Sequence, residues 1–299
     1  MEENNLMSQM SDMIRKMFHE GDVKRDAGLT TPKDIVRFDN IQYGTVEPKW
    51  QMLDVYRPKN ITGKLPVILS VHGGGWVYGD KDVYQFYCMS LAQRGFAVVN
   101  YSYRLAPEYK YPASIEDTKD VCDWIIANAD EYGFDTDHIF GVGDSAGAHM
   151  LSMFACALTN PKYAKTTGFE LPKDFAFKAI ALNCGAFLIS PEGKQDMTTQ
   201  LMGDYLPQGG TKEEFDLIST VNHVTEDFPP VFIMTCPGDF LNEQPMHMIP
   251  KLEKLKVPFI YRRYGDRNDD LAHVFHCNIR LKAATLCNDE ECEFFRKYL

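Results

Sequence analysis

The stretch that decides the fold is residues 140–149, Phe-Gly-Val-Gly-Asp-Ser-Ala-Gly-Ala-His. It follows a short β-forming run and precedes Met150–Leu158, an apolar run typical of a helix. Between them lies Gly-x-Ser-x-Gly, at Gly143, Ser145 and Gly147. So tight a strand-to-helix turn strains the backbone of the serine, and the glycines remove Cβ atoms that would clash. We therefore expect the serine hydroxyl to project where the N-terminus of the following helix favours negative charge.

Composition places the chain among ordinary globular proteins. It has 299 residues, 44% hydrophobic and 24% charged, enough for one large α/β domain or two small ones. The net charge of −11 argues against nucleic acid or an anionic membrane as a main partner, because both attract basic surfaces. Residues 1–5 carry no basic region and no long apolar segment follows, so we expect no signal peptide and no transmembrane helix.

The cysteines are scattered and form no Cys-x-x-Cys pair or zinc-like cluster. They are Cys88, Cys122, Cys156, Cys184, Cys236, Cys277, Cys287 and Cys292. Several lie within apolar runs, which is typical of buried, reduced thiols. We therefore expect a cytoplasmic protein without disulfides and without a metal site.

Strand-like apolar runs alternate with helical patterns over most of the chain. Two β-rich segments, 34–45 and 52–56, are predicted to form an antiparallel pair. The further strands are expected at 65–71, 96–103, 138–142, 175–182, 231–234 and 258–264, and the helices at 82–94, 112–132, 150–158, 243–255 and 278–298. This alternation predicts an α/β fold, a mostly parallel central sheet with helices on both faces.

Two segments fall outside the alternation. Residues 5–20 have apolar positions at helical spacing, and residues 187–227 form an insertion with a short helix from Lys212. The helix could simply dock on the body, but an insertion of such length is more often functional than a plain linker. We interpret residues 1–299 as a single domain in which approximately 1–30 and 187–227 form a helical cap.

A serine nucleophile needs a base, because its hydroxyl reacts poorly at neutral pH. In the fold with this type of turn, the acid and then the histidine follow the serine along the chain. His273 and His276 both lie after the last predicted strand, and both could reach the carboxyl edge of the sheet. The residues alone leave this choice open.

The acid should follow a strand between the serine and the histidine. Asp239 does so, four residues after the run Val231–Thr235, although an aspartate here could also cap the next helix. Asp269 and Asp270 are nearer to the histidines in sequence. Neighbours on one loop rarely approach each other across a sheet, so we expect them to be solvated.

Backbone N–H groups are needed to stabilise an oxyanion in acyl transfer. The run His72-Gly73-Gly74-Gly75 follows a buried strand, and its glycines can turn their N–H groups inward. The N–H of Ala146 supplies a complementary donor. The run lacks the spacing of phosphate-binding loops, so nucleotide binding is not expected, and the chemistry requires no cofactor.

Together these motifs resemble the hormone-sensitive-lipase-like branch of the α/β-hydrolase fold. They occur in the order of that family over roughly residues 50–277. The matching pieces are His72-Gly73-Gly74-Gly75-Trp76, Tyr103-Arg104-Leu105-Ala106-Pro107-Glu108 with Tyr111-Pro112-Ala113, Gly143-Asp144-Ser145-Ala146-Gly147, Gly238-Asp239-Phe240-Leu241 and His273-Val274-Phe275. The chain departs from many relatives at Ala148 and Ala272, where those relatives carry other small residues or proline.

The resemblance implies a role for each motif residue. Ser145 would be the nucleophile, Asp239 the acid and His273 the base, since the family's histidine is commonly followed by phenylalanine in this pattern. The same resemblance places the oxyanion donors and the residues that contact substrate. The donors would be Gly74, Gly75 and Ala146, and the substrate contacts His72, Gly73, Trp76 and Asp144.

The activity implied is hydrolysis of short or medium acyl esters by a carboxylesterase. Two alternatives use the same machinery, an arylformamidase acting on N-formylkynurenine-like substrates and an acetyl or feruloyl esterase acting on polysaccharides. A non-catalytic receptor is the remote alternative, because relatives of that kind lose the histidine that this chain keeps at His273. A small-molecule ester is the expected partner, and a homodimer is compatible with these features.

Overall fold

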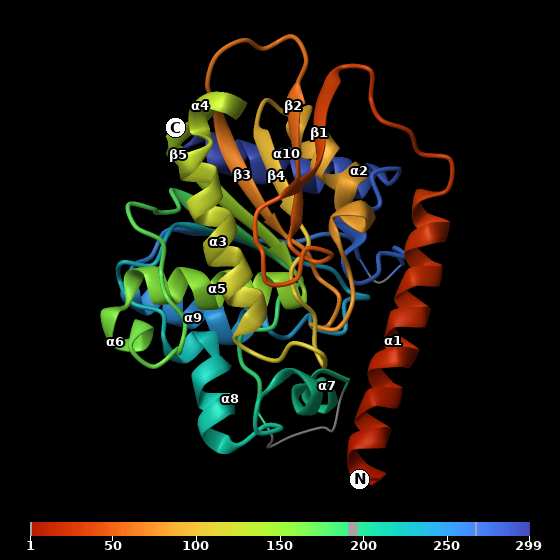
Figure 1. The fold of residues 1–299 in the computed structure, drawn as a ribbon, viewed down its shortest axis with the longest axis vertical. Coiled ribbons are helices and arrows are strands. Elements are labelled where there is room, and N and C mark those ends of the chain that lie inside the picture. The colour runs from red at the N-terminus through yellow and green to blue at the C-terminus, as the bar shows by residue number, and fades with distance from the viewer. Residues whose placement is uncertain (1, 191–196, 267) are drawn as a thin grey trace.

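The computed structural model describes residues 2–190, 197–266 and 268–299 and has an eight-stranded central sheet (Figure 1). The strands are β1 (Ile35–Gln42), β2 (Met52–Pro58), β3 (Leu65–Val71), β4 (Ala97–Tyr101), β5 (Phe134–Asp144), β6 (Ala179–Asn183), β7 (Val231–Thr235) and β8 (Phe259–Arg263). Their order is β1-β2-β4-β3-β5-β6-β7-β8. The pairs β1·β2 and β2·β4 are antiparallel, and all pairs from β4·β3 to β7·β8 are parallel. The predicted α/β sheet is confirmed.

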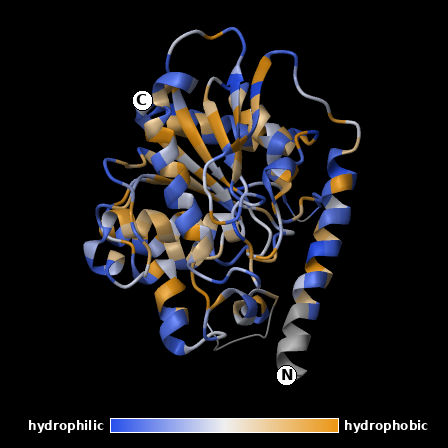
Figure 2. Ribbon diagram, in the orientation of Figure 1, coloured by the Kyte–Doolittle hydropathy of each residue, from blue (hydrophilic) through white to orange (hydrophobic). Residues whose placement is uncertain are grey.

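Helices cover both faces of the sheet. They are α1 (Glu2–Asp26), α2 (Lys81–Ala92), α3 (Ala113–Ala127), α4 (Ala129–Tyr132), α5 (Ala146–Thr159), α6 (Pro161–Ala164), α7 (Met197–Tyr205), α8 (Lys212–Ile218), α9 (Pro245–Leu255) and α10 (Lys282–Arg296). Buried side chains of α2 and α10 form one apolar cluster with the sheet, and those of α3, α5 and α9 form the other. The strands between the two layers are apolar in Figure 2, as parallel strands buried on both faces must be.

The interior strands follow directly from their composition. All residues of β4, β6 and β7 are buried, and only Pro66 of β3 is half-buried. Because strand ends at one edge of a parallel sheet lie side by side, the loops after β3, β5, β7 and β8 meet there. Those loops carry the motifs identified in the sequence.

Three segments of the chain differ from the sequence prediction. The single helix predicted for residues 112–132 is wrong, because the chain breaks at Asn128 into α3 and α4. The Asn128 side chain donates to the carbonyl of Trp124 at 2.8 Å, beside the Asn128 backbone N–H, which donates to the same carbonyl at 3.0 Å. The polar connection after α5 contains α6, whose N-cap is Asn160. The stretch before Lys212 contains α7.

Helix α1 runs along one side of the molecule and packs against α7 (Figure 1). Ile14 is fully buried in the core. The Arg15 guanidinium donates to the carbonyls of Val77 and Ala106, both at 2.8 Å, and pairs with Glu108. The helix thus binds the loops that follow β3 and β4.

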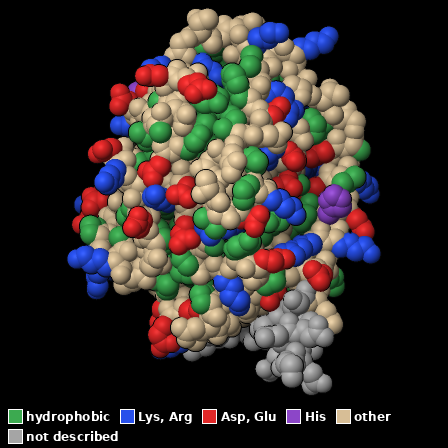
Figure 3. All heavy atoms as spheres, viewed as in Figure 1, with side chains coloured by type: hydrophobic (Ala, Val, Ile, Leu, Met, Phe, Trp, Pro, Cys, Tyr) green, Lys and Arg blue, Asp and Glu red, His purple; other side chains and the backbone are tan. Residues whose placement is uncertain are grey.

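The surface mixes both signs of charge. On the face seen in Figure 3, acidic and basic side chains are interspersed, so the net charge of −11 does not gather into one patch there. Within the described residues, no helix is both long and apolar enough to cross a bilayer.

Candidate active site

Ser145 occupies a strained turn between β5 and α5. Its φ is 52° and ψ −120°, a left-handed conformation that side-chain-bearing residues rarely adopt. A Cβ at Gly143 would lie 2.7 Å from the backbone of Gly147, and one at Gly147 would overlap the carbonyl oxygen of Val71. The Ser145 N–H donates to the carbonyl of Asn183 in β6 at 2.9 Å. Close packing of β3, β5 and α5 therefore requires both glycines and fixes the serine.

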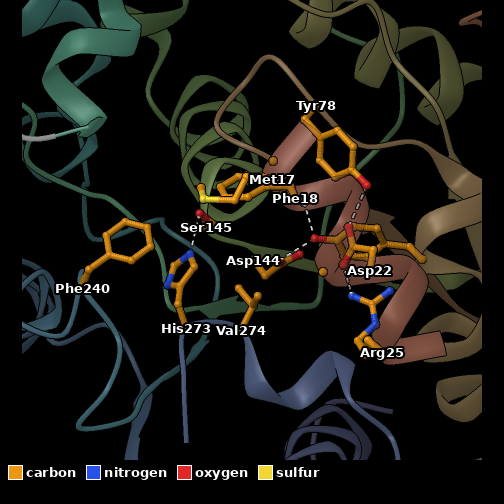
Figure 4. A pocket seen from close by; sticks show the side chains of 14 residues that line it. Met17, Phe18, Asp22, Arg25, Tyr78, Asp144, Ser145, Phe240, His273 and Val274 are labelled. Carbon is orange, nitrogen blue, oxygen red and sulfur yellow. Dashed lines mark hydrogen bonds and ion pairs between the residues drawn. The ribbon is translucent and has the colours of Figure 1, made fainter. Parts of the chain in front are cut away.

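The structure brings Ser145, His273 and Asp239 together from three loops, and Figure 4 shows the His273 imidazole beside the Ser145 hydroxyl. Asp239 follows β7 and His273 follows β8. The distance from His273 Nε2 to Ser145 Oγ is 2.9 Å, and that from His273 Nδ1 to Asp239 Oδ1 is 2.6 Å. These contacts form one continuous line from carboxylate to imidazole to hydroxyl.

Asp239 is held in place as a charged acceptor. Its Oδ2 accepts from Thr235 Oγ1 at 2.6 Å, and its Oδ1 accepts from the Leu241 N–H at 2.8 Å. Burial by itself would raise the pKa of this carboxyl, but the contact with His273 and these two donors outweigh it and hold the pKa below its usual value. A carboxylate fixed in this way holds the imidazole in one orientation and in one tautomer.

Of the two candidate histidines, the structure places His273 and not His276 against the Ser145 hydroxyl. His276 is fully buried, and its ring packs edge-on against Tyr87 with 5.0 Å between centroids. Burial lowers the pKa of His276 to about 3, so this imidazole stays neutral.

Asp269, the acid nearer to the histidines in sequence, lies on the loop after β8. Its carboxylate accepts from the Asp266 N–H at 2.8 Å.

The glycine loop after β3 lines the same cavities as Ser145. Gly74 and Gly75 have φ of 124° and 61°, and a Cβ at Gly74 would overlap the carbonyl of Tyr78. Among the described residues, no hydrogen bond is donated by the N–H of Gly74, Gly75 or Ala146. Those N–H groups thus remain available beside Ser145, as an oxyanion requires.

The four residues expected to contact substrate lie in two layers. Gly73, Trp76 and Asp144 line the cavities at Ser145. His72 does not line them, contrary to expectation, because its ring is fully buried and stacks on Tyr103 at 4.0 Å between centroids. Its Nδ1 donates to the Gly73 carbonyl at 2.8 Å, so His72 supports the loop from behind.

Asp144 is buried at the base of the site. Its carboxylate accepts from the Tyr84 hydroxyl at 2.7 Å, and that hydroxyl accepts from the Gly73 N–H at 2.9 Å. Burial raises the pKa of Asp144 to about 6. This chain of contacts ties the nucleophile turn to the glycine loop.

The sequence motifs assigned no role to His149, which lies on α5. His149 Nδ1 accepts from Trp76 Nε1 at 3.2 Å, and its Nε2 donates to the Ile218 carbonyl at 2.9 Å. Trp76 also stacks on Tyr205 of α7 at 5.3 Å between centroids. The glycine loop is therefore joined to α7 and α8. The position one turn after Ser145 was the only available signal.

The buried His149 predicts a measurable effect of pH on stability. Burial lowers the pKa of its imidazole to about 4, whereas an unfolded chain has about 6.5. Between these values the unfolded state binds one more proton, so this contribution to stability falls as the pH falls. His149→Gln, which keeps a donor and an acceptor, should reduce the slope of unfolding free energy against pH by about 1.4 kcal/mol per unit in that window. Urea unfolding at several pH values measures it, and equal slopes in both proteins would contradict a neutral buried imidazole.

In the part of the chain that the structure describes, two clusters have metal-ligand atoms within 4.8 Å of one another. They are Asp144–His276–Cys277 and Cys184–Asp239–His273. Burial raises the pKa of the thiols of Cys277 and Cys184 well above the usual value, which disfavours the thiolate that metal binding needs. In the second cluster, Asp239 and His273 already bind each other.

Two cavities open beside Ser145. The larger, about 270 Å³, lies between α1, the glycine loop and His273. The smaller, about 20 Å³, lies between Gly75, Ala146 and α7. Figure 4 shows the larger cavity, with Met17 and Phe18 of α1 beside Ser145, and Tyr78 and Asp22 further from it.

Comparison with known proteins identifies the family. The profile of the BD-FAE family matches residues 53–243. Versiconal hemiacetal acetate esterase of Dothistroma septosporum is 29% identical over 227 residues, which are 70% of this chain and 67% of that protein. Carboxylesterase NlhH of Mycobacterium tuberculosis is 40% identical over 199 residues, 63% of this chain and 61% of that protein.

A solved structure extends the likeness over the whole chain. The crystal structure of esterase B from Lactobacillus rhamnosis superposes with a TM-score of 0.89 at 25% identity, covering 100% of this chain and 96% of that chain. The chain spans from 30% to 67% of the length of the curated esterases that it matches. Since the profile covers more than half of the chain, this protein belongs to the BD-FAE family, in the hormone-sensitive-lipase-like carboxylesterase branch of the α/β-hydrolases.

Proposed function

We propose that this protein is a serine hydrolase of short and medium acyl esters, acting through an acyl-enzyme. The observation that carries the proposal is the line of contacts from Asp239 through His273 to Ser145, with distances of 2.6 and 2.9 Å. A related structure, of esterase B from Lactobacillus rhamnosis with a tributyrin phosphonate inhibitor, supports it. Phosphonates of this kind mimic the tetrahedral stage of ester hydrolysis.

In the first half of the reaction, Ser145 Oγ attacks the ester carbonyl carbon. His273 Nε2 takes the hydroxyl proton, and the carbonyl oxygen becomes an oxyanion near the N–H groups of Gly74, Gly75 and Ala146. The tetrahedral species then collapses. The bond to the alcohol breaks, the alcohol leaves with the proton from Nε2, and the acyl group stays on the serine.

In the second half, water replaces the alcohol. His273 takes a proton from the water as its oxygen attacks the acyl carbon, and the collapse returns that proton to Ser145 and releases the acid. Asp239 stays charged throughout. It accepts from Nδ1 and stabilises the imidazolium that forms in each half.

We propose that residues 1–30 and 187–227 form the cap of this single domain. Residues of α1 line the larger cavity, and Met197, Thr198 and Leu201 of α7 line the smaller one. The hydrogen bond between Ser11 and Asp204 joins the two segments. Residues 1 and 191–196 of this cap lie outside the described residues.

We also propose a reducing compartment, the cytoplasm, as the site of action. All eight cysteines are buried and unpaired, as is usual for proteins kept reduced. Assembly as a homodimer stays a prediction, to be measured by sedimentation.

A panel of substrates tests the proposed activity against its alternatives. Purified protein should hydrolyse p-nitrophenyl acetate and butanoate faster, by kcat/KM, than N-formylkynurenine or acetylated xylan. The matched control is the Ser145→Ala variant, which should release no product above background. A preference for the formamide or the polysaccharide would replace ester hydrolysis of small molecules by one of the alternative functions.

A further inference from the structure

The two cavities at Ser145 differ in size and in the groups that line them. Phe18, Ser145 and Phe240 line both, so the cavities meet at the serine hydroxyl. The larger holds about 270 Å³ and the smaller about 20 Å³. A space of 20 Å³ admits one group of the size of water or a methyl.

The transfer of a proton from His273 to the leaving alcohol distinguishes the alcohol side of the ester from its acyl side. The leaving alcohol oxygen must receive its proton from His273 Nε2, so it has to lie on the side of the imidazole. His273 lines the larger cavity and does not line the smaller. The smaller is lined instead by Gly75, Ala146 and residues of α7. The alcohol side and the acyl side are thereby distinguished.

We propose that the larger cavity binds the alcohol part of the ester and that the smaller cavity binds the acyl group and favours acetyl over longer acyl chains. The natural substrates are then acetate esters of sizeable, mainly apolar alcohols. The inference rests on the proposed function, because it assigns the two sides of the bond that Ser145 attacks.

The acyl side is closed by α7. Leu201 is 2% exposed and lines the smaller cavity, and an added Cβ at Gly75 would come within 2.9 Å of its Cδ1. Trp76 forms a further wall and is fixed by Tyr205 and His149. A longer acyl chain must displace this leucine, so Leu201 limits the acyl length.

The alcohol side is bounded by α1. Met17 and Phe18 give it an apolar wall, whereas its far end is polar, where the Tyr78 hydroxyl donates to Asp22 at 2.8 Å and Arg25 pairs with the same carboxylate. Gly21 lies in this wall, and nothing lies within 4 Å of a Cβ added there. A larger side chain at Gly21 would therefore narrow the alcohol side without a clash in the protein.

Two substrate series and two variants test the assignment. One series holds p-nitrophenol constant and lengthens the acyl group from acetyl to hexanoyl; the other holds acetate constant and enlarges the alcohol from methyl to butyl, benzyl and 2-naphthyl. The variants are Leu201→Ala on the acyl side and Gly21→Leu on the alcohol side. Met197→Ala is a second acyl-side variant, used if Leu201→Ala does not fold.

Each variant should change one series only. We expect Leu201→Ala to raise kcat/KM for hexanoyl relative to acetyl by about tenfold or more, with the acetate series unchanged. We expect Gly21→Leu to lower kcat/KM for 2-naphthyl relative to methyl acetate by a similar factor, with the acyl series unchanged. Comparing ratios between variant and parent cancels the intrinsic reactivity of each ester.

The failures are distinguishable. If Gly21→Leu alters the acyl series and the acyl-side variant alters the acetate series, the assignment is reversed while ester hydrolysis by Ser145 stands. If the parent protein hydrolyses hexanoyl and acetyl esters equally, the acyl limit is wrong. If no ester in either series is hydrolysed, the proposed function itself fails.

Discussion

Replacing Ser145 with alanine is expected to lower kcat for p-nitrophenyl acetate by at least about 10⁴-fold. The variant keeps the backbone bond to Asn183 and loses only the hydroxyl that approaches His273 at 2.9 Å. Without that oxygen no acyl-enzyme forms, and the residual rate comes from binding and the glycine loop. Stopped-flow or steady-state release of p-nitrophenol measures the loss, and circular dichroism checks the fold.

Ser152→Ala is a matched control for this variant. Ser152 lies on α5, the helix that follows Ser145, is buried, and donates its hydroxyl to the His149 carbonyl at 2.8 Å. Its loss should leave kcat unchanged within about twofold, since intrahelical bonds of this kind contribute little to a site they do not touch. Full activity in the Ser145 variant would show that another group attacks the ester.

The second large effect is expected for Asp239→Asn, which should lower kcat by about 10⁴-fold. The amide can still accept at one atom, but its NH₂ group cannot accept from His273 Nδ1. The imidazole would then adopt the other tautomer, in which Nε2 carries the hydrogen. In that form Nε2 cannot accept the proton of the Ser145 hydroxyl. KM should change little, because the carboxylate does not line either cavity.

Asp269→Asn tests whether the effect belongs to Asp239. Asp269 lies on the loop after β8, nearer to His273 in sequence, and its carboxylate accepts from a backbone N–H within that loop. This variant should keep kcat within about twofold of the parent. A large loss for Asp269→Asn together with a small one for Asp239→Asn would reverse the assignment of the acid.

The convergence of Ser145, Asp239 and His273 could be anticipated because each follows a predicted strand of a parallel sheet. Strand ends at one edge of such a sheet are neighbours, whatever the number of residues between them. The apolar runs predict β3, β6 and β7, and the glycines on either side of Ser145 predict the strand-to-helix turn. Local chemistry and topology therefore agreed for Ser145 and Asp239, whereas the choice of His273 over His276 rested on the family resemblance.

Other features depend on contacts that no local pattern encodes. The bridge from Trp76 through His149 to Ile218 joins three segments that are 73 and 69 residues apart along the chain, and a lone histidine on an apolar helix gives no hint of it. The placement of His72 behind its loop follows from stacking on Tyr103, a residue of a different strand end. The break at Asn128, whose side chain and backbone N–H both donate to the Trp124 carbonyl, falls within an otherwise helical pattern.

Labelling with a fluorophosphonate probe tests the central claim, that Ser145 is an activated nucleophile, most directly. The intact protein should gain the mass of one probe, and peptide mapping should locate it on the peptide that carries Ser145, with Ser145→Ala unlabelled. Ser152→Ala should label as the parent does. Absence of labelling in the folded parent protein, or a probe found on any residue other than Ser145, would contradict the account.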